Sequence, residues 1–211
     1  MEDAEAIVAG DGRWAELSLV VERDLLARFY RIFQGGFLIK ARVGTGVGRF
    51  LRERLGLPPQ YVAERISTIF LDGKPVDDLD AATVTEGSTL ALSSAMPGLV
   101  GATMRRQGFY ASLRNTITHK QEEWHGEEKE GLLQVKVFNL LMADLGPLFL
   151  ERGIYVPSGE LELFFAAEPD RFFDGIKGAA LDGRSVQPSS LRRAGTIGGC
   201  GWTHLRACAS P

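Results

Sequence analysis

The sequence predicts an α+β protein made of two tandem copies of one small unit, in which a mixed β-sheet is crossed by one helix. A repeated hexapeptide is the first observation: Leu71–Val76 (LDGKPV) returns 110 residues later as Leu181–Val186 (LDGRSV). An amphipathic helix pattern precedes each copy, and the neighbouring segments alternate apolar and polar residues, as half-buried strands do. The separation of the copies is about the length of one domain.

Each hexapeptide predicts a β-hairpin. An Asp-Gly pair tolerates the positive φ angles of a tight hairpin turn, and apolar residues flank the pair in both copies. In the first copy a strand over 66–71 leads into the turn. Another strand is expected over 89–93, after a turn at Glu86-Gly87-Ser88.

The rest of the first unit is predicted as two strands and a helix. The strands cover 29–33 and 37–43, with a turn at Gln34-Gly35-Gly36 between them. Thr45 is the expected helix cap. The apolar stripe of that helix is Val47, Phe50, Leu51 and Leu55. The order of the unit is therefore β-β-α-β-β.

The second unit is predicted to repeat this order. Leu133, Val135 and Val137 form one face of a strand, a further strand covers 154–156, and Ser158 is the expected helix cap. The spacing of Leu161, Phe164 and Phe165 reproduces that of Val47, Phe50 and Leu51. The end from Gly195 should hold the last strand of this unit, but glycine is a poor strand residue, so either this strand is irregular or the end does not belong to the ancestral fold.

These patterns divide the chain into four parts. Residues 1–24 are a segment for which neither helix nor strand is favoured, 25–104 are the first unit, 105–131 are a charged connector, and 132–211 are the second unit with an irregular tail. The connector is expected to be solvated because it is rich in charge and contains glycine.

Composition limits the kinds of partner and the cellular location that this protein is expected to have. The net charge of −3 does not favour nucleic acid as the partner of the whole chain. The apolar runs are too short and too interrupted by charge to span a bilayer, and the acidic start lacks the basic residues of a secretory signal. We therefore expect a cytoplasmic protein, with no membrane partner, whose two cysteines are thiols.

Residues 66–101 resemble the C-terminal part of the small sulfur-carrier proteins of molybdopterin and thiamine biosynthesis, members of the β-grasp (ubiquitin-like) superfamily. The resemblance rests on Leu71–Val76, Glu86–Leu92 and Met96–Gly101. It implies two tandem β-grasp units. The carriers end in a free Gly-Gly whose carboxylate becomes a thiocarboxylate. Here Pro97-Gly98-Leu99-Val100-Gly101 stands instead and the chain continues, so carrier or modifier activity would need processing near Gly101.

Three sets of residues are candidate sites. A protein-interaction face is expected on strand 37–43, a nucleic-acid patch in the connector, and a zinc site in the tail, where a fourth ligand could come from His119 or His125. The face consists of Leu38, Lys40 and Arg42, the patch of Arg105, Arg106, Phe109, Tyr110 and Arg114, and the zinc site of Cys200, His204 and Cys208.

Each set also has a simpler interpretation. The connector could pack Phe109 and Leu113 and leave its arginines in water, and the spacing of the tail residues matches no short zinc motif. Gly44–Gly48 could hold a phosphate on helix amides but lacks the remaining P-loop residues, so a strand-to-helix turn is favoured.

The sequence therefore predicts a protein-interaction or adaptor protein without catalytic machinery or cofactor. No convergent acid, base and nucleophile set is recognisable, which argues against an enzyme. The partner expected is an unknown protein. The alternatives are a sulfur-carrier-like or modifier protein processed near Gly101, and an RNA-associated module that uses the basic connector.

Overall fold

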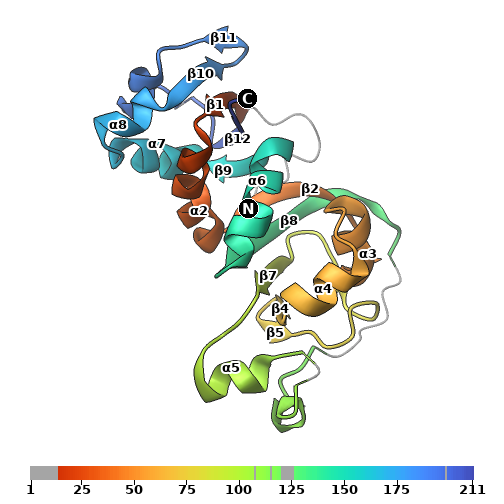
Figure 1. Cartoon of the computed structure of the whole chain (residues 1–211). Helices are drawn as coiled ribbons and strands as arrows, with labels where there is room; N and C mark the ends of the chain where they lie inside the picture. The colour runs from red at the N-terminus through yellow and green to blue at the C-terminus, as the bar shows by residue number, and fades with distance from the viewer. Residues whose placement is uncertain (1–13, 107, 115, 120–125, 198) are drawn as a thin grey trace. The chain divides into compact units, whose positions relative to one another are not determined.

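A computed structural model describes residues 14–106, 108–114, 116–119, 126–197 and 199–211 (Figure 1). The chain forms two compact units. The inserted unit is Phe33–Asp144, and the discontinuous unit combines the chain up to Ile32 with Leu145–Pro211. Both contain helices and a mixed sheet, which confirms the α+β class.

The sheet of the inserted unit has a parallel pair at its centre. Its order is β2 (Phe37–Val43), β8 (Lys129–Phe138), β7 (Thr89–Ser93), β4 (Thr68–Leu71) and β5 (Lys74–Pro75). Strands β7 and β8 are parallel, and the other neighbours are antiparallel. A separate antiparallel pair joins β3 (Thr45–Gly46) to β6 (Thr83–Val84).

The sheet of the discontinuous unit repeats these strand directions. Its order is β11 (Arg184–Ser185), β10 (Ile176–Leu181), β1 (Trp14–Val21), β12 (Trp202–Ala209) and β9 (Ile154–Pro157). Strands β1 and β12 are parallel along their whole length, from Trp14 opposite Trp202 to Val21 opposite Ala209. Their outer neighbours β10 and β9 are antiparallel to them.

The two hexapeptides form the same hairpin, as predicted. Asp72 and Gly73 have φ angles of 51° and 77°, and Asp182 and Gly183 have 49° and 75°. In each copy the aspartate also holds the hairpin to the neighbouring strand of the sheet. Asp72 accepts a hydrogen bond from the backbone N–H of Thr89 at 2.7 Å, and Asp182 accepts one from the backbone N–H of Glu16 at 2.8 Å. The hexapeptide therefore joins its hairpin to β7 in one unit and to β1 in the other.

Each unit also contains short helices and helical turns. The inserted unit contains α3 (Val47–Arg49), a π-helical turn η2 (Phe50–Arg54), α4 (Pro59–Arg65), α5 (Gly98–Met104) and a 3-10 turn η3 (Ala111–Arg114). The discontinuous unit contains η1 (Arg23–Phe29), α7 (Ser158–Ala166), α8 (Asp170–Asp174) and η4 (Pro188–Arg192). The unit boundaries fall within α2 (Tyr30–Gly35) and α6 (Leu141–Arg152).

The predicted helix stripes are confirmed. Val47, Phe50, Leu51 and Leu55 are buried, as are Leu161, Phe164 and Phe165. The predicted caps are wrong, because Gly46 and Pro157 occupy the cap positions. Thr45 instead donates to the Arg42 carbonyl at 3.2 Å, and the buried Ser158 hydroxyl lies 2.8 Å from that of Thr203.

The strand predicted over 29–33 is wrong. This segment is helical, and its buried residues Phe29 and Phe33 continue the helical spacing that begins at the buried Leu26. The antiparallel partner of β2 is β8, paired from Phe37 opposite Val135 to Val43 opposite Lys129. The alternation of Leu133, Val135 and Val137 correctly predicted a strand, but a local pattern does not specify which sheet a strand joins.

One predicted boundary and the predicted irregular end also differ from the structure. The division at residue 132 cuts through β8, which lies in the inserted unit. The end of the chain is regular where irregularity was expected, since β12 pairs with both β1 and β9. Its glycines precede the strand. In the described part of the chain, no helix combines the length and apolar character needed to cross a bilayer.

A small polar cluster ties α4 to the first turn of α6 within the inserted unit. Asp144 accepts hydrogen bonds from Tyr61 at 3.0 Å and from Arg65 at 2.8 and 3.2 Å. The Arg65 bonds hold the pKa of Asp144 below its ordinary value. Burial, followed by the bond to Asp144, raises the pKa of Tyr61 to about 12.

We expect this cluster to make stability depend on pH. A carboxyl whose pKa is lowered by folding stabilises the native state above its ordinary pKa and loses that effect as pH falls through the folded value. Asp144→Asn should therefore cost more stability at about pH 7 than at about pH 3, measured by urea denaturation. An equal cost at both pH values would contradict the assignment. Because folding raises the pKa of Tyr61, its protonated hydroxyl stabilises the native state, and this contribution is lost as pH rises through about 12.

Candidate interaction surface

Exposed apolar side chains concentrate between β7 and β8, on residues 98–117, which we call the apolar segment. Leu99 and Val100 on α5 are 71% and 63% exposed, and Phe109 and Leu113 around η3 are 90% and 72% exposed. Tyr110 and Ile117 are exposed as well. In the described remainder of the chain, only Leu140 and Leu163 are exposed hydrophobic residues of comparable size. Solvent-exposed apolar residues gathered in this way are typical of binding surfaces.

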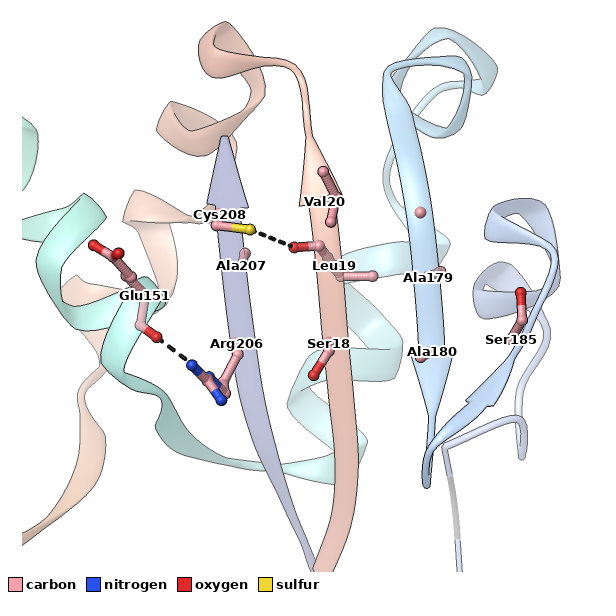
Figure 2. A pocket seen from close by; sticks show the side chains of 11 residues that line it. Ser18, Leu19, Val20, Glu151, Ala179, Ala180, Ser185, Arg206, Ala207 and Cys208 are labelled. Carbon is pink, nitrogen blue, oxygen red and sulfur yellow. Dashed lines mark hydrogen bonds between the residues drawn. The ribbon is translucent and has the colours of Figure 1, made fainter. Parts of the chain in front are cut away.

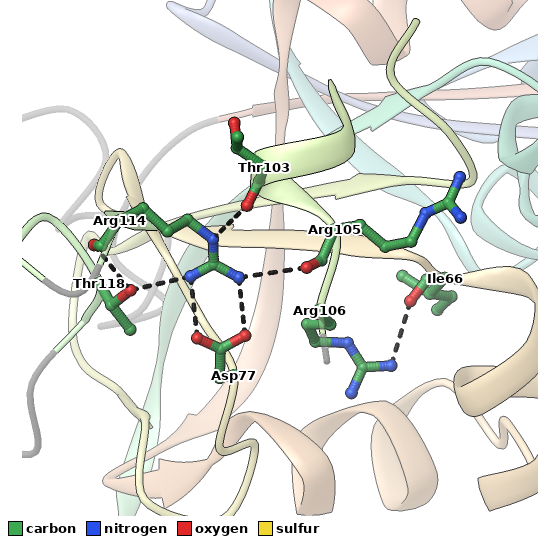
Figure 3. A network of polar contacts seen from close by, with 7 residues as sticks. All are labelled: Ile66, Asp77, Thr103, Arg105, Arg106, Arg114 and Thr118. Carbon is green, nitrogen blue, oxygen red and sulfur yellow. Dashed lines mark hydrogen bonds and ion pairs between the residues drawn. The ribbon is translucent and has the colours of Figure 1, made fainter. Parts of the chain in front are cut away.

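A buried arginine anchors the apolar segment (Figure 3). The Arg114 side chain is 2% exposed and makes two parallel bonds to the Asp77 carboxylate, at 2.7 and 2.8 Å. It also donates to the carbonyl of Thr103 at 2.7 Å and to the hydroxyl of Thr118 at 2.8 Å. One guanidinium therefore joins the end of α5, the turn η3 and the chain that follows β5.

A second arginine holds the beginning of the connector. Arg106 donates to the carbonyls of Val62 and Ile66 at 3.0 and 3.1 Å, and its backbone N–H donates to Ser67 at 2.8 Å. Burial lowers the pKa of its guanidinium. The Arg105 side chain, by contrast, is exposed and extends away from the network in Figure 3.

The predicted nucleic-acid patch is thus only partly assembled. Phe109 and Tyr110 are exposed and meet edge to face, with ring centroids 5.1 Å apart. Of the three arginines, Arg114 is buried in an ion pair and Arg106 is bonded to carbonyls, which leaves Arg105 at the surface. The simpler interpretation is reversed for two of the three arginines: Arg106 and Arg114 pack, while Phe109 and Leu113 face water.

The predicted face on β2 is not assembled. Leu38 is buried, Lys40 is half-buried, and the exposed Arg42 pairs with Glu128 at 3.0 Å. Phe37, Leu38 and Ile39 are buried in succession, so alternation does not hold at the start of this strand. Leu38 therefore offers no apolar contact on the surface.

The predicted zinc site does not converge. His204 and Cys208 lie on one face of β12, but four residues of strand separate them by about 13 Å, whereas the ligands of one zinc lie within about 4 Å of each other. His204 Nδ1 lies 2.8 Å from Glu16, Cys208 contacts the Leu19 carbonyl at 3.7 Å, and Cys200 is half-buried before the strand. Among the residues that the structure describes, no three His, Cys, Asp or Glu side chains could hold a metal. His119 is half-buried, and His125 lies outside the described residues.

Gly101 lies in the interior of helix α5. It is buried, and even a methyl group at this position would overlap the backbone carbonyl of Met96. Processing after Gly101 would therefore require α5 to unfold first.

The glycine-rich turn before α3 uses its amides within the protein. Gly44, Val47 and Gly48 donate to the carbonyls of Val84, Ala82 and Leu79 at 2.7–2.8 Å. These N–H groups are therefore already occupied, as the turn interpretation predicts, and a phosphate would have to displace protein carbonyls.

The discontinuous unit has a groove of about 480 Å³ on its sheet (Figure 2). Small residues of β1 and β10 form much of its floor, including Ser18, Gly178 and Ala180. Arg206 donates to the Glu151 carbonyl at 3.2 Å beside the exposed Cys208 thiol. The lining also includes the carboxyl residue Glu151 and the hydroxyl residue Ser185.

Comparison of the chain with protein-family models, with curated proteins and with solved structures found no match.

Proposed function

We propose that this chain is a non-catalytic interaction protein that binds a protein partner through the apolar segment. One observation carries the proposal: large exposed side chains gather on a segment that a buried ion pair holds in place. Aromatic residues are enriched in the cores of protein interfaces, and a fixed segment loses less entropy on binding than a mobile one. The proposed contact residues are therefore Leu99, Val100, Phe109 and Leu113.

We also propose that both units are β-grasp-like. The Asp-Gly hairpin and the matching strand directions of the two sheets support a common ancestry. The chain departs from a simple tandem arrangement, since β8 lies beside β2 and the N-terminal β1 lies beside β12. Fold does not determine function, so the interaction proposal rests on the surface.

A photo-crosslinking experiment tests the interaction proposal. A benzophenone amino acid at position 110 should capture a discrete protein from native extract. Phe109→Ser combined with Leu113→Ser should reduce capture at least about tenfold, as expected for central interface residues. The melting temperature should stay unchanged because both side chains face water.

Leu163→Ser provides the matched control. Leu163 is 73% exposed and lies in the discontinuous unit, so this change removes a comparable apolar side chain elsewhere. Capture by this variant should equal that of the wild type. If the Phe109→Ser, Leu113→Ser double variant captured the partner as well as the wild type does, the proposal would be refuted.

A further inference from the structure

We propose that the apolar segment recognises a partner peptide that is acidic as well as apolar. This inference rests on the proposed function and specifies the chemistry of the partner. Its first support is the distribution of charge. The sequence contains no Asp or Glu from residue 87 to residue 121, although the chain as a whole has a net charge of −3. The exposed apolar side chains therefore lie in a locally basic stretch.

The arginines of this stretch differ in how their charge is balanced. The charge of Arg114 is neutralised by Asp77. Arg106 is held by two carbonyl oxygens, which solvate a cation without cancelling its charge. Arg105 is exposed, next to both Arg106 and the end of α5. A carboxylate of the partner would balance this positive charge while its apolar side chains cover Phe109 and Leu113.

The same features disfavour an anionic membrane or RNA. Membrane-surface helices combine one long apolar face with many cations, and each cation adds about 1 kcal/mol. Here Leu99 and Val100 lie on a seven-residue helix and Leu113 on a four-residue turn, while Phe109 precedes that turn, so no long helical face exists in the described part of this segment. RNA binding likewise depends on several phosphate contacts. Among the described residues of this stretch, one exposed and one half-buried guanidinium are few for either ligand, but are sufficient to select a carboxylate in a short peptide.

A peptide-display selection on the full chain tests the inference. A random library should yield sequences in which Asp or Glu flank apolar residues. Their binding should be lost with Phe109→Ser and Leu113→Ser, and should weaken about threefold to fivefold with Arg105→Glu, as expected for one exposed charge. Arg184→Glu is the matched control. It makes the same charge change at an exposed site on the hairpin of the other unit and should leave binding unchanged.

Several outcomes would overturn the inference. The first is that the selected peptides carry no excess of carboxylates. The second is that no selected peptide depends on Phe109 and Leu113 for binding. The third is that the Arg105→Glu variant binds the peptides as tightly as the wild type. Adsorption to phosphatidylserine vesicles that requires Phe109 would point to lipid, and Phe109-dependent dimers in sedimentation would point to a second copy. If one of these outcomes is found and crosslinking in extract still requires Phe109 and Leu113, only the inference that the partner is acidic is refuted. If crosslinking does not require them, the proposed function also fails.

Discussion

Replacing Asp77 with alanine should lower the free energy of unfolding by about 3 kcal/mol, because it leaves the buried Arg114 guanidinium without its carboxylate. Three backbone and hydroxyl contacts would remain, but none carries a compensating charge. The loss should appear in urea denaturation followed by circular dichroism. Hydrogen exchange should accelerate over residues 98–118, since the anchor of the apolar segment is weakened.

Two comparisons separate this effect from a general loss of charge. Replacing Asp77 and Arg114 together with leucine should be less destabilising than Asp77→Ala, because no unpaired charge stays buried. Glu53→Gln, which breaks the exposed Arg49–Glu53 pair, should change stability little. Asp77→Ala should also weaken capture of the partner. Unchanged stability in this variant would show that the pair does not anchor the segment.

A fragment of residues 145–211 should fail to fold alone, whereas a fragment of residues 33–144 should fold. The first lacks β1, which pairs with β10 on one side and β12 on the other. Leu17, Leu19 and Val21 of this strand are buried, so the fragment would lose both their burial and two ladders of hydrogen bonds. The second fragment retains all five strands β2, β8, β7, β4 and β5 and their pairings with one another.

Circular dichroism and a cooperative urea transition would distinguish the fragments. Co-expression of residues 14–32 with residues 145–211 should restore a folded complex, because the missing strand is then supplied. A cooperative unfolding transition in the isolated 145–211 fragment would contradict the claim that this unit needs β1 in order to fold. Failure of the 33–144 fragment would contradict its independence.

Local structure was predictable where a few neighbouring residues determine it. The Asp-Gly turns require positive φ angles, and the helix stripes are local periodicities, so both are legible in the sequence. The segment 29–33 was misread because aromatic and β-branched residues favour strands, while burial against the discontinuous unit's Phe164 and Phe172 selects a helical turn at Phe29. The pairing of β1 with β12 joins residues 188 positions apart, and no local pattern encodes it.

The proposed surface was harder to predict because it depends on a buried charge. Arginine is rarely buried, so the sequence favours water for Arg114 and the interior for Phe109 and Leu113. The structure reverses this assignment because Asp77, 37 positions earlier in the chain, supplies the counter-charge. The absence of carboxylates from 87 to 121 was visible in the sequence, but it acquires meaning only once the exposed residues are known.

The central position of β1 sets an order of events during translation. Residues 14–21 are made before the inserted unit, while β10 and β12 are made only after it. The inserted unit can close its sheet once β8 has emerged, so we expect it to fold first. Until β10 and β12 have been made, the nascent β1 has neither neighbour. The polar Glu16 and Ser18, which alternate with its buried leucines, then limit its pairing with other chains.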